Sequence, residues 1–310
     1  MDVSIIIPTY NRLWSLPIAI ESCRHTKCTA EIIVVDDGSD DGTWEWLNQQ
    51  QGLVIVRQEH LGKCWAVNCG YSLARGKYVK FLDSDDLITN GSLDEQFQLA
   101  EANLSDIVVS GYHLIDQAGQ LLKDQPWIEC DDFIAQQLGE CDGSHYSAFL
   151  FTKEILTDIP HRPDYAFRDD RMLILEVALK HPKVAIYQGF ALQHRVHQYD
   201  RLQSTTGLRQ SAQNFQHLNL YKFITGQLIL ENQFNERRKV AAATKLWPLA
   251  QWIAIYSLNE AVQVAKWGHS LNPNFKIPDK GLRGWLYKYF GFKRTEQLLK
   301  IRRTIVKLFK

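Results

Sequence analysis

Short apolar runs alternate with amphipathic segments along the first part of the chain. Residues 3–7, 31–35, 53–56 and 78–82 are mostly apolar and rich in β-branched side chains, a pattern typical of strands buried on both faces. Between them lie three segments with apolar side chains at helical spacing, which are residues 14–23, 43–47 and 63–74. Strands and helices that alternate at this spacing predict an α/β fold with a mostly parallel central sheet and helices on both faces.

The pattern changes further along the chain. We expect a helix that Ser92 caps, a hairpin turning at residues 117–119, and no strand beyond residue 211. Gly268 and Pro273 are expected to end helices. The later predicted elements are helix 92–102, strand 106–110, hairpin 111–123, strand 147–151, helix 172–179, strand 183–192, and helices 211–230 and 236–267. The sequence therefore predicts an α/β domain over residues 1–205 and a helical extension over residues 206–310.

The last 31 residues differ in charge from the rest of the chain. The formal net charge of the 310 residues is zero, but residues 280–310 contain ten Lys or Arg and one acid. Apolar side chains recur there at helical spacing, from Trp285 to Phe309, opposite a basic face. Such a helix either lies on an anionic membrane surface or docks on the protein's own acidic body. Both interpretations stay open, and we expect no nucleic-acid partner.

Six cysteines show no C-x-x-C spacing, which favours free thiols in a reducing compartment. The sequence shows no secretory signal and no apolar run of membrane-spanning length. Together with the ordinary composition, 45% apolar and 23% charged, these features predict a globular cytoplasmic protein. The basic tail would then hold it peripherally at the inner face of the membrane.

Acidic side chains gather where two of the predicted strands end. Asp83, Asp85 and Asp86 follow the strand 78–82, and Asp36 and Asp37 end the strand 31–35. In parallel sheets the carboxyl ends of the strands meet at one edge, where ligands bind. Carboxylates held close together repel unless a cation neutralises them, and oxygen ligands suit Mg²⁺ or Mn²⁺. A solvated turn whose last aspartate caps a helix is the alternative, which the shared edge disfavours.

Two later segments also carry candidate chemistry. Asp169 and Asp170 open an apolar helix, where the helix dipole alone could account for them. His194, Arg195 and His197 follow a strand, and they are either loop residues or a metal ligand and a phosphate clamp. No glycine-rich dinucleotide or P-loop motif follows the first strand, so a bound nucleotide would rely on carboxylates and a metal.

Three segments in the expected order resemble the family 2 glycosyltransferases. They are residues 4–12 (SIIIPTYNR), 33–43 (IVVDDGSDDGT) and 76–86 (GKYVKFLDSDD), and the likeness extends over residues 2–205. The resemblance implies a GT-A fold and an inverting enzyme that uses a nucleotide sugar, with Mn²⁺ or Mg²⁺ as cofactor. Residues 62–68 also match a family segment, although the bulky Trp65 is unusual there.

The resemblance also implies roles for single residues. Thr9, Tyr10 and Asp37 correspond to base contacts, Asp83 to a ribose contact and Asp85 to the metal ligand of the D-x-D motif. His197 matches a position near the diphosphate, and we expect it to join Asp85 at the metal. Asp170 corresponds to the general base, but Asp169 stands where many members have Glu, so either could serve. The complete predicted donor site comprises Pro8, Thr9, Tyr10, Asn11, Arg12, Asp37, Lys63, Asp83, Ser84 and Arg195.

The implied reaction moves a hexose from a UDP- or dTDP-sugar to a hydroxyl of a glycan, glycolipid or related acceptor. Polysaccharide or cell-envelope glycan synthesis is the expected setting. One alternative is a metal-dependent nucleotidyltransferase, which usually has a glycine- and lysine-rich loop after its first strand. Another is a protein of the same fold that binds nucleotide sugars without catalysis.

Overall fold

The computed structural model describes residues 1–197 and 207–308, with side chains up to residue 303. The chain forms two compact units, here called the sheet unit (residues 1–129 and 142–200) and the helical unit (residues 130–141 and 201–310). The predicted boundary between residues 205 and 206 lies outside the described residues. Residues 130–141, which the sequence analysis assigns to the first domain, group with the helical unit because the short helix within them packs on a later helix.

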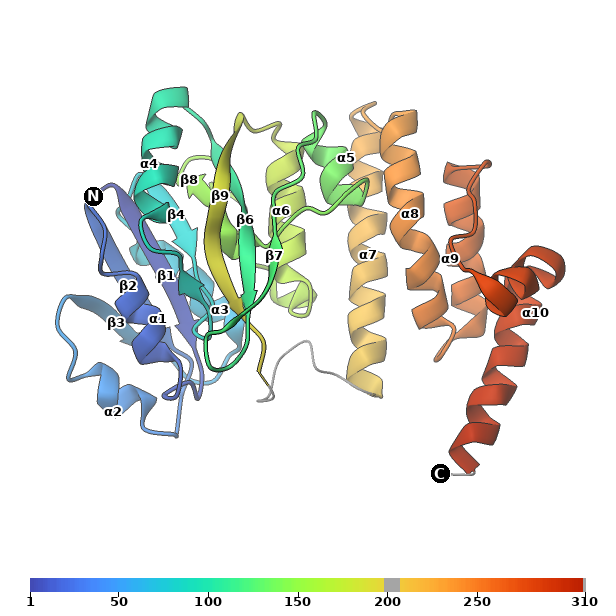
Figure 1. Cartoon of the computed structure of the whole chain (residues 1–310), viewed down its shortest axis with the longest axis horizontal. Helices are drawn as coiled ribbons and strands as arrows, with labels where there is room; N and C mark the ends of the chain where they lie inside the picture. Colours follow the sequence, from blue (N-terminus) through green and yellow to red (C-terminus); the bar gives the residue numbers. More distant parts are fainter. Residues whose placement is uncertain (198–206, 309–310) are drawn as a thin grey trace. The chain divides into compact units, whose positions relative to one another are not determined.

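The sheet unit contains a mixed nine-stranded sheet in the order β3-β2-β1-β4-β8-β6-β9-β5, with β7 paired to β6 (Figure 1). β1 lies between β2 and β4, and all three run parallel. β8 runs antiparallel to both β4 and β6. The strands are β1 (Val3–Thr9), β2 (Ala30–Asp36), β3 (Leu53–Arg57), β4 (Tyr78–Phe81), β5 (Leu87–Ile88), β6 (Ile107–Ile115), β7 (Leu121–Gln125), β8 (Leu150–Thr152) and β9 (Val184–Arg195).

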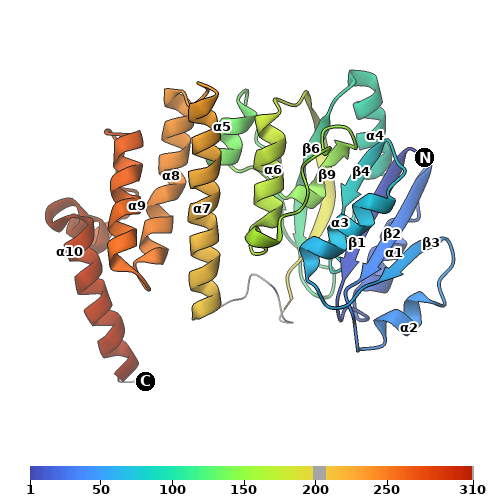
Figure 2. The same cartoon turned by 180° about the vertical axis from the view of Figure 1, so that it is seen from behind.

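Helices cover both faces of this sheet, as the alternating pattern predicts. α1 and α4 lie on the face turned to the viewer in Figure 1, and α3 and α6 on the face turned to the viewer in Figure 2. The helices of the unit are α1 (Leu16–Ser22), α2 (Thr43–Leu47), α3 (Lys63–Leu73), α4 (Ser92–Asn103) and α6 (Asp169–Leu179), with short 3₁₀ turns at Tyr146–Ala148 and Pro163–Tyr165.

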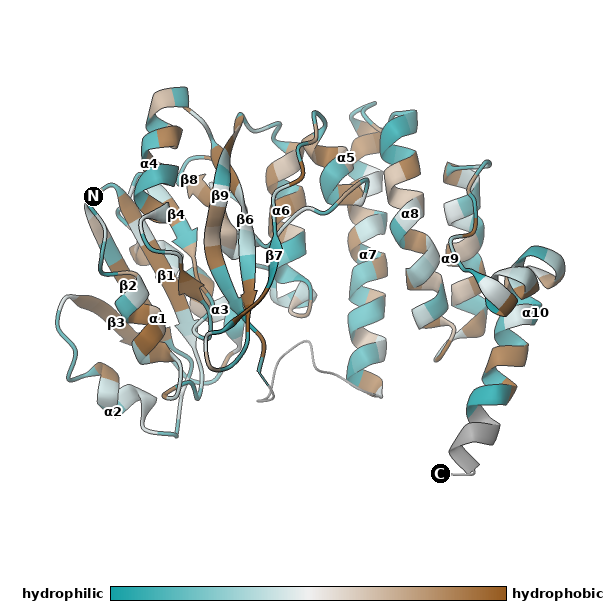
Figure 3. Ribbon diagram, viewed as in Figure 1, coloured by the Kyte–Doolittle hydropathy of each residue, from teal (hydrophilic) through white to brown (hydrophobic). Residues whose placement is uncertain are grey.

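The central strands are buried because they are apolar on both faces. Every residue of β1 is buried, as are six of the seven residues of β2, and Figure 3 shows their brown, hydrophobic colour. Burial on both sides leaves solvent access only at the strand ends. The polar side chains that follow β1, β2 and β4 therefore lie at the edge where a ligand can reach them.

Local details correct three expectations. Gly91, with φ of +75°, precedes α4 as its N-cap, whereas the Ser92 hydroxyl donates to the carbonyl of Thr89. The predicted strand 106–110 and the first arm of the hairpin form one strand, β6, because its partner β9 is also long. Gly268 does not end a helix; it lies inside α9, where it faces Leu246 of α8.

The helical unit consists of α5 (Phe133–Leu138), α7 (Leu208–Leu230), α8 (Glu236–Ile253), α9 (Leu258–Leu271) and α10 (Gly281–Leu308). α8 packs against α5, α7 and α9, and the hydroxyl of Tyr221 in α7 donates to the carbonyl of Leu138 at 2.8 Å. The expected single helix over residues 236–267 is two helices, which part at residues 254–257. No described helix is long and apolar enough to cross a bilayer.

The basic tail forms α10, which is interrupted at Gly291 by a left-handed φ of +72°. Tyr287 is buried on the ring of Trp247 in α8, with ring centroids 5.1 Å apart, and its hydroxyl donates to the buried Glu296. One face of the tail is therefore docked on its own unit. Other apolar side chains of the same helix stay exposed, namely Leu282, Trp285, Tyr289, Phe290, Leu298 and Ile301. The position predicted for Phe309 lies outside the described residues.

Candidate active site at the carboxyl edge of the sheet

The two acidic clusters predicted from the sequence lie at the same edge of the sheet unit. Asp37 follows β2 and Asp83 follows β4, and β1 lies between these two strands. The backbone N–H of Asp37 donates to the carbonyl of Thr9 at 2.8 Å, and that of Leu82 donates to Ile6 at 3.0 Å. These bonds extend the parallel ladder past the strands and fix the start of each acidic loop.

Asp37 is buried, and its carboxylate already accepts several hydrogen bonds. Oδ1 accepts from Gln58 Nε2 at 2.6 Å and from the backbone N–H of Leu61 at 2.9 Å. Oδ2 accepts from the backbone N–H of Gly62 at 2.9 Å and lies 2.9 Å from Nδ1 of His60. These contacts satisfy the carboxylate oxygens of a residue that is only 3% exposed.

The residues at the end of β1 provide one ring and one buried hydroxyl. Tyr10 is exposed, and the ring of His60 stacks on it with centroids 4.0 Å apart and planes at 24°. Pro8 and Thr9 are buried in β1. The buried hydroxyl of Thr9 finds no hydrogen-bond partner among the described residues.

Asn11 and Arg12 connect the loops after β1, β2 and β4. The side chain of Asn11 makes two bonds to Asp40, because its Nδ2 donates to Asp40 Oδ1 and its Oδ1 accepts from the backbone N–H of Asp40. The guanidinium Nε of Arg12 lies 3.9 Å from Asp85 Oδ2. Asn11 thus links the loops after β1 and β2, while Arg12 contributes positive charge beside the carboxylates.

Lys63 brings the carboxylates of β4 and α6 together. Its Nζ lies 2.6 Å from Asp83 Oδ1 and 5.3 Å from the ring centre of the buried Tyr146. Burial alone would lower the pKa of Lys63, but the negative charges of Asp83, Asp169 and Asp170 raise it well above its ordinary value. The ammonium therefore stays charged among three carboxylates that come from distant parts of the sequence.

Asp85 and His197 form a pair of potential metal ligands. His197 Nε2 lies 2.8 Å from Asp85 Oδ2, and its ring packs edge-on against Trp14 at 4.9 Å between centroids. Adjacent ligands of an octahedral ion are about 3 Å apart when each metal–ligand distance is about 2.1 Å. Oxygen atoms of Asp83, Asp85 and Asp86 also lie within 4.8 Å of one another. The donor set fits a divalent cation.

Asp86 is held differently from the other two aspartates of the cluster. It is fully buried, and its Oδ1 accepts from the backbone N–H of Arg195 at 2.8 Å while its Oδ2 lies 3.0 Å from His194 Nδ1. Burial raises the pKa of Asp86 to about 6, against the opposing charge of His194. Asp86 therefore joins the loop after β4 to the end of β9.

Asp86, His145 and His194 also place one potential ligand atom each within 4.8 Å. The rings of His145 and His194, however, are stacked at 4.8 Å with planes at 28°. The lone pair of an imidazole nitrogen lies in the ring plane, so one ion cannot lie in both of two nearly parallel planes. We therefore assign no metal to this cluster.

Asp169 and Asp170 differ sharply in their surroundings. Asp169 is buried, and its Oδ2 lies 2.8 Å from Nδ1 of the buried His161, whose backbone is clamped by both side-chain groups of Asn68. Burial opposes its charge, yet the hydrogen bond from His161 and the charge of Lys63 lower the pKa of Asp169. Asp170 is half-buried and accepts the backbone N–H of Arg171 at 2.7 Å. Asp170 is the more accessible carboxylate of the two.

Two of the residues predicted to bind the nucleotide-sugar donor are largely buried. Arg195 is 5% exposed, and its Nη1 donates to the carbonyl of Gln117 at 3.2 Å. Ser84 is also buried, and its carbonyl accepts from Ser15 Oγ at 2.9 Å. The surroundings of both residues are those expected of residues that support the acidic loop. Their contact with a nucleotide-sugar donor remains a prediction.

Four further residues complete this edge and were not predicted from the sequence, namely His60, Asn68, His161 and Tyr146. Each meets its partner across 8 to 93 positions of sequence, and no motif links them. The one available signal was the match of residues 62–68 to a family segment, which includes Asn68.

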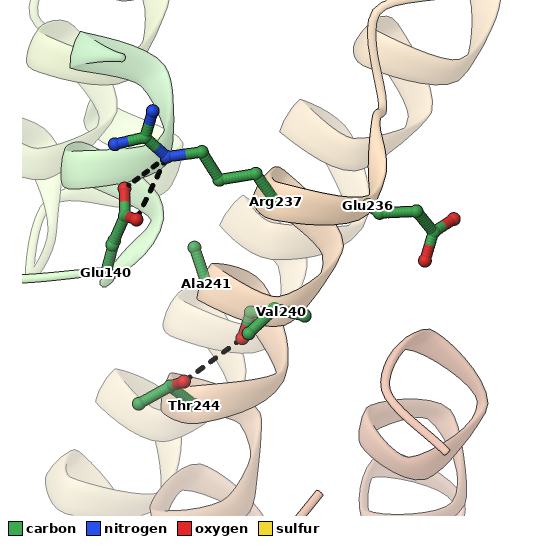
Figure 4. A pocket seen from close by; sticks show the side chains of 6 residues that line it. All are labelled: Glu140, Glu236, Arg237, Val240, Ala241 and Thr244. Atoms are coloured by element: carbon green, nitrogen blue, oxygen red, sulfur yellow. Dashed lines mark hydrogen bonds and ion pairs between the residues drawn. The ribbon is translucent and has the colours of Figure 1, made fainter. Parts of the chain in front are cut away.

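A separate pocket lies within the helical unit. Glu140, Glu236, Arg237, Val240, Ala241 and Thr244 line it (Figure 4). Arg237 Nε lies 2.9 Å from both carboxylate oxygens of Glu140. Arg237 and Glu140 thus pair with each other, and Glu236 pairs with Lys239. The pocket contains none of the residues predicted from the sequence to be functional.

The model of the family described as "Glycosyl transferase family 2" matches residues 4–159, just over half of the 310 residues. The chain is 30% identical over 122 residues to "Glycosyltransferase GlyG" of Streptococcus pneumoniae, covering 37% of this chain and 40% of GlyG. It is 32% identical over 116 residues to "UDP-Glc:alpha-D-GlcNAc-diphosphoundecaprenol beta-1,3-glucosyltransferase WfaP" of Escherichia coli, covering 36% of this chain and 46% of WfaP. Each match thus spans less than half of the relative.

Solved structures give the same fold. S. aureus TarS 1-349 in complex with UDP-GlcNAc has a TM-score of 0.54 and 16% sequence identity, covering 88% of this chain and 91% of that chain. The complex of the same protein with UDP has a TM-score of 0.51, with 14% identity and 88% of each chain covered. The predicted fold is confirmed, with a helical region after a GT-A-type sheet.

Proposed function

This chain belongs to glycosyl transferase family 2, and from that premise we propose that it transfers a hexose from a nucleoside-diphosphate sugar to an acceptor hydroxyl with inversion. The proposal rests on the position of Lys63. Its ammonium group contacts Asp83 after β4, and its pKa is raised by the negative charges of Asp169 and Asp170 at the start of α6. The carboxylate proposed to contact the donor and the carboxylates proposed as general base thus act on the same ammonium group. A single displacement requires donor and base in one site.

For the donor we propose a UDP- or dTDP-sugar. Tyr10 offers a ring face, and Asp37 offers a carboxylate that can accept the imide N–H of uracil or thymine. Asp83 lies on the ribose side, and Thr9 has a hydroxyl with no partner among the described residues. The TarS structures with UDP-GlcNAc and UDP support a uracil nucleotide as the first candidate.

For the cofactor we propose Mn²⁺ or Mg²⁺ held by Asp85 and His197. When bound, such an ion supplies positive charge that stabilises the leaving diphosphate. Arg12 beside Asp85 adds a fixed positive charge at the same place. Asp85→Ala should therefore abolish metal-dependent donor binding, which titration of UDP with and without Mn²⁺ measures. Full binding and turnover in EDTA would contradict the metal assignment.

Asp170 is our proposed general base. It is the accessible member of the pair, whereas Asp169 is buried and holds His161. A base must reach the acceptor hydroxyl within hydrogen-bond distance, which an enclosed carboxylate already bonded to an imidazole cannot do. Asp169 then keeps the start of α6 in place, so that Asp170 faces the acceptor.

The acceptor we propose is a lipid-linked glycan of polysaccharide or cell-envelope synthesis. WfaP, whose name gives a diphosphoundecaprenol-linked sugar as its acceptor, supports this class. A lipid-linked acceptor is reached at a membrane surface. The enzyme would then act on the cytoplasmic side, attached peripherally.

The exposed face of α10 is our proposed membrane contact. Trp285 is 50% and Tyr289 63% exposed on the same face, and the rings lie 5.2 Å apart. Residues 280–310 carry ten basic side chains and one acid. Aromatic side chains favour the headgroup region, and a basic cluster attracts anionic lipid. Glu296, the one acid, is buried against Tyr287 and Arg303, so it weakens this attraction little.

Co-sedimentation with lipid vesicles tests the membrane contact. The full chain should pellet with phosphatidylglycerol vesicles and much less with phosphatidylcholine vesicles. The variant Trp285→Ser with Tyr289→Ser should stay in solution, since both rings are exposed and their loss leaves the fold intact. Equal pelleting of the variant and the parent would overturn the contact.

A donor screen tests the reaction itself. The protein, Mn²⁺ and a set of UDP- and dTDP-sugars should release nucleoside diphosphate from one donor, and EDTA should stop the release. Release of inorganic diphosphate would indicate the nucleotidyltransferase alternative. Donor binding without release from any donor, with lipid-linked acceptors supplied, would indicate the non-catalytic alternative.

A further inference from the structure

His60 occupies the place at which the nucleobase is expected. Its ring stacks on Tyr10 at 4.0 Å, and its Nδ1 lies 2.9 Å from Asp37 Oδ2. A ring against Tyr10 and a donor to Asp37 are the two contacts that the proposed donor site offers to uracil or thymine. The imidazole therefore makes both contacts at once.

The hydrogen bonds of Asp37 show which group would have to yield. Oδ1 accepts from Gln58 and from the backbone of Leu61, and Oδ2 accepts from the backbone of Gly62. His60 Nδ1 is hydrogen-bonded to the backbone carbonyl of Asp37 at 3.1 Å and lies 2.9 Å from Oδ2. The two backbone donors are fixed by the loop that leads into α3. The side chain of His60 is 57% exposed, whereas that of Asp37 is 4% exposed. His60 can turn into solvent without opening the core, and the backbone donors cannot.

We propose that His60 is a displaceable occupant of the base site, which the base must expel to stack on Tyr10 and reach Asp37. This inference rests on the proposed function, because it takes the donor to be a pyrimidine nucleotide. His60 then sets the affinity for the donor, since binding competes with the contacts between His60, Tyr10 and Asp37.

The cost of expulsion sets the size of the effect. An exposed aromatic stack is worth about 0.5–1.5 kcal/mol, and the apparent affinity falls in proportion to the fraction of molecules with an open site. Removing the imidazole should therefore tighten nucleoside binding about three- to tenfold. Tighter binding after removal of a side chain is a distinctive result, because damage to the fold would weaken binding instead.

The test is calorimetric titration of uridine and of UDP into the full chain and three variants. His60→Ala should bind both ligands about three- to tenfold more tightly than the parent. Tyr10→Ala should bind more weakly, because it removes the stacking surface. Glu59→Ala is the matched control, since Glu59 is the exposed neighbour of His60 in the same loop, and it should bind like the parent.

The outcomes separate this inference from the proposed function. If the parent binds UDP and His60→Ala binds it equally or more weakly, His60 is not a competitor, and weaker binding would make it a second stacking partner of the base. If neither the parent nor His60→Ala binds any pyrimidine nucleotide, the proposed donor class and this inference both fall. Tighter binding of uridine by His60→Ala alone, with Glu59→Ala unchanged, supports the inference.

Discussion

The sheet unit buries side chains that proteins usually expose, and the tail of the helical unit exposes side chains that proteins usually bury. The sheet unit encloses charged side chains, among them Asp37, Asp86, Asp169 and Lys80, and each has hydrogen-bond partners. The tail of the helical unit exposes rings such as Trp285 and Tyr289. Enclosed charge is costly unless it is paired, and exposed rings forgo burial. The contrast matches the two roles proposed above, catalysis for the first unit and membrane contact for the second.

The largest effect is expected at Asp170, where the comparison is with its enclosed neighbour. Asp170→Asn should lower kcat about 10²–10⁴-fold, the usual contribution of a general base, while the affinity for UDP stays within about twofold. Initial rates and UDP titration measure the two quantities. Equal losses of turnover and of donor affinity would remove Asp170 from the base role.

The next largest effect is a difference in stability between substitutions of a buried and of an exposed ring on α10. Tyr287→Ser should lower the free energy of unfolding by about 3 kcal/mol, because the ring is buried against Trp247 and its hydroxyl pairs with Glu296. Trp285→Ser, two residues earlier on the exposed face, should cost less than about 0.5 kcal/mol. Urea unfolding of both variants measures the difference. Similar losses at the two positions would contradict the docked and exposed faces assigned to the tail.

Lys80 tests the enclosed charge of the sheet unit. It is fully buried in β4, its Nζ donates to the neutral oxygens of Gln96 and Phe149, and burial lowers the pKa of Lys80 to about 7. The folded-state pKa lies below the unfolded one, so unfolding takes up a proton and stability rises with pH. From pH 7 to pH 9 the gain should be about 2 kcal/mol. Lys80→Met should lack this increase in urea unfolding at both pH values.

The smallest effect is expected at Asp86, which holds the end of β9 without being a proposed ligand. Asp86→Ala should weaken Mn²⁺ binding about tenfold, because His197 loses its fixed position near Asp85. Electron paramagnetic resonance of free Mn²⁺ measures the affinity. In a His197→Ala background the same substitution should add nothing, and an additive loss would show that Asp86 acts on the metal by another route.

The sequence predicts the parts of the site that lie at strand ends. β1, β2 and β4 are mostly apolar runs, so their ends, and with them Asp37, Asp83 and Asp85, can be placed at one edge. It does not predict the antiparallel insertion of β8 between β4 and β6, because pairing between distant segments leaves no local pattern. The break of α10 at Gly291 could have been expected from the glycine between two helical stretches.

The sequence also does not show which carboxylates remain accessible. Asp169 and Asp170 are adjacent and chemically identical, but Asp169 is buried and bonded to His161, eight residues earlier, whereas Asp170 is half-buried. Likewise, nothing near His60 indicates that its ring lies on Tyr10. Such pairings depend on the packing of whole elements, and a pattern of residue types along the chain carries no information about them.

The central claim is that one displacement, with the acceptor hydroxyl activated at Asp170, transfers the sugar. The stereochemistry of the product tests it most directly. Proton NMR of the product formed from the α-linked donor that the screen identifies should show a β-linked sugar, because a single displacement inverts the anomeric centre. A product that retains the α configuration would contradict the account.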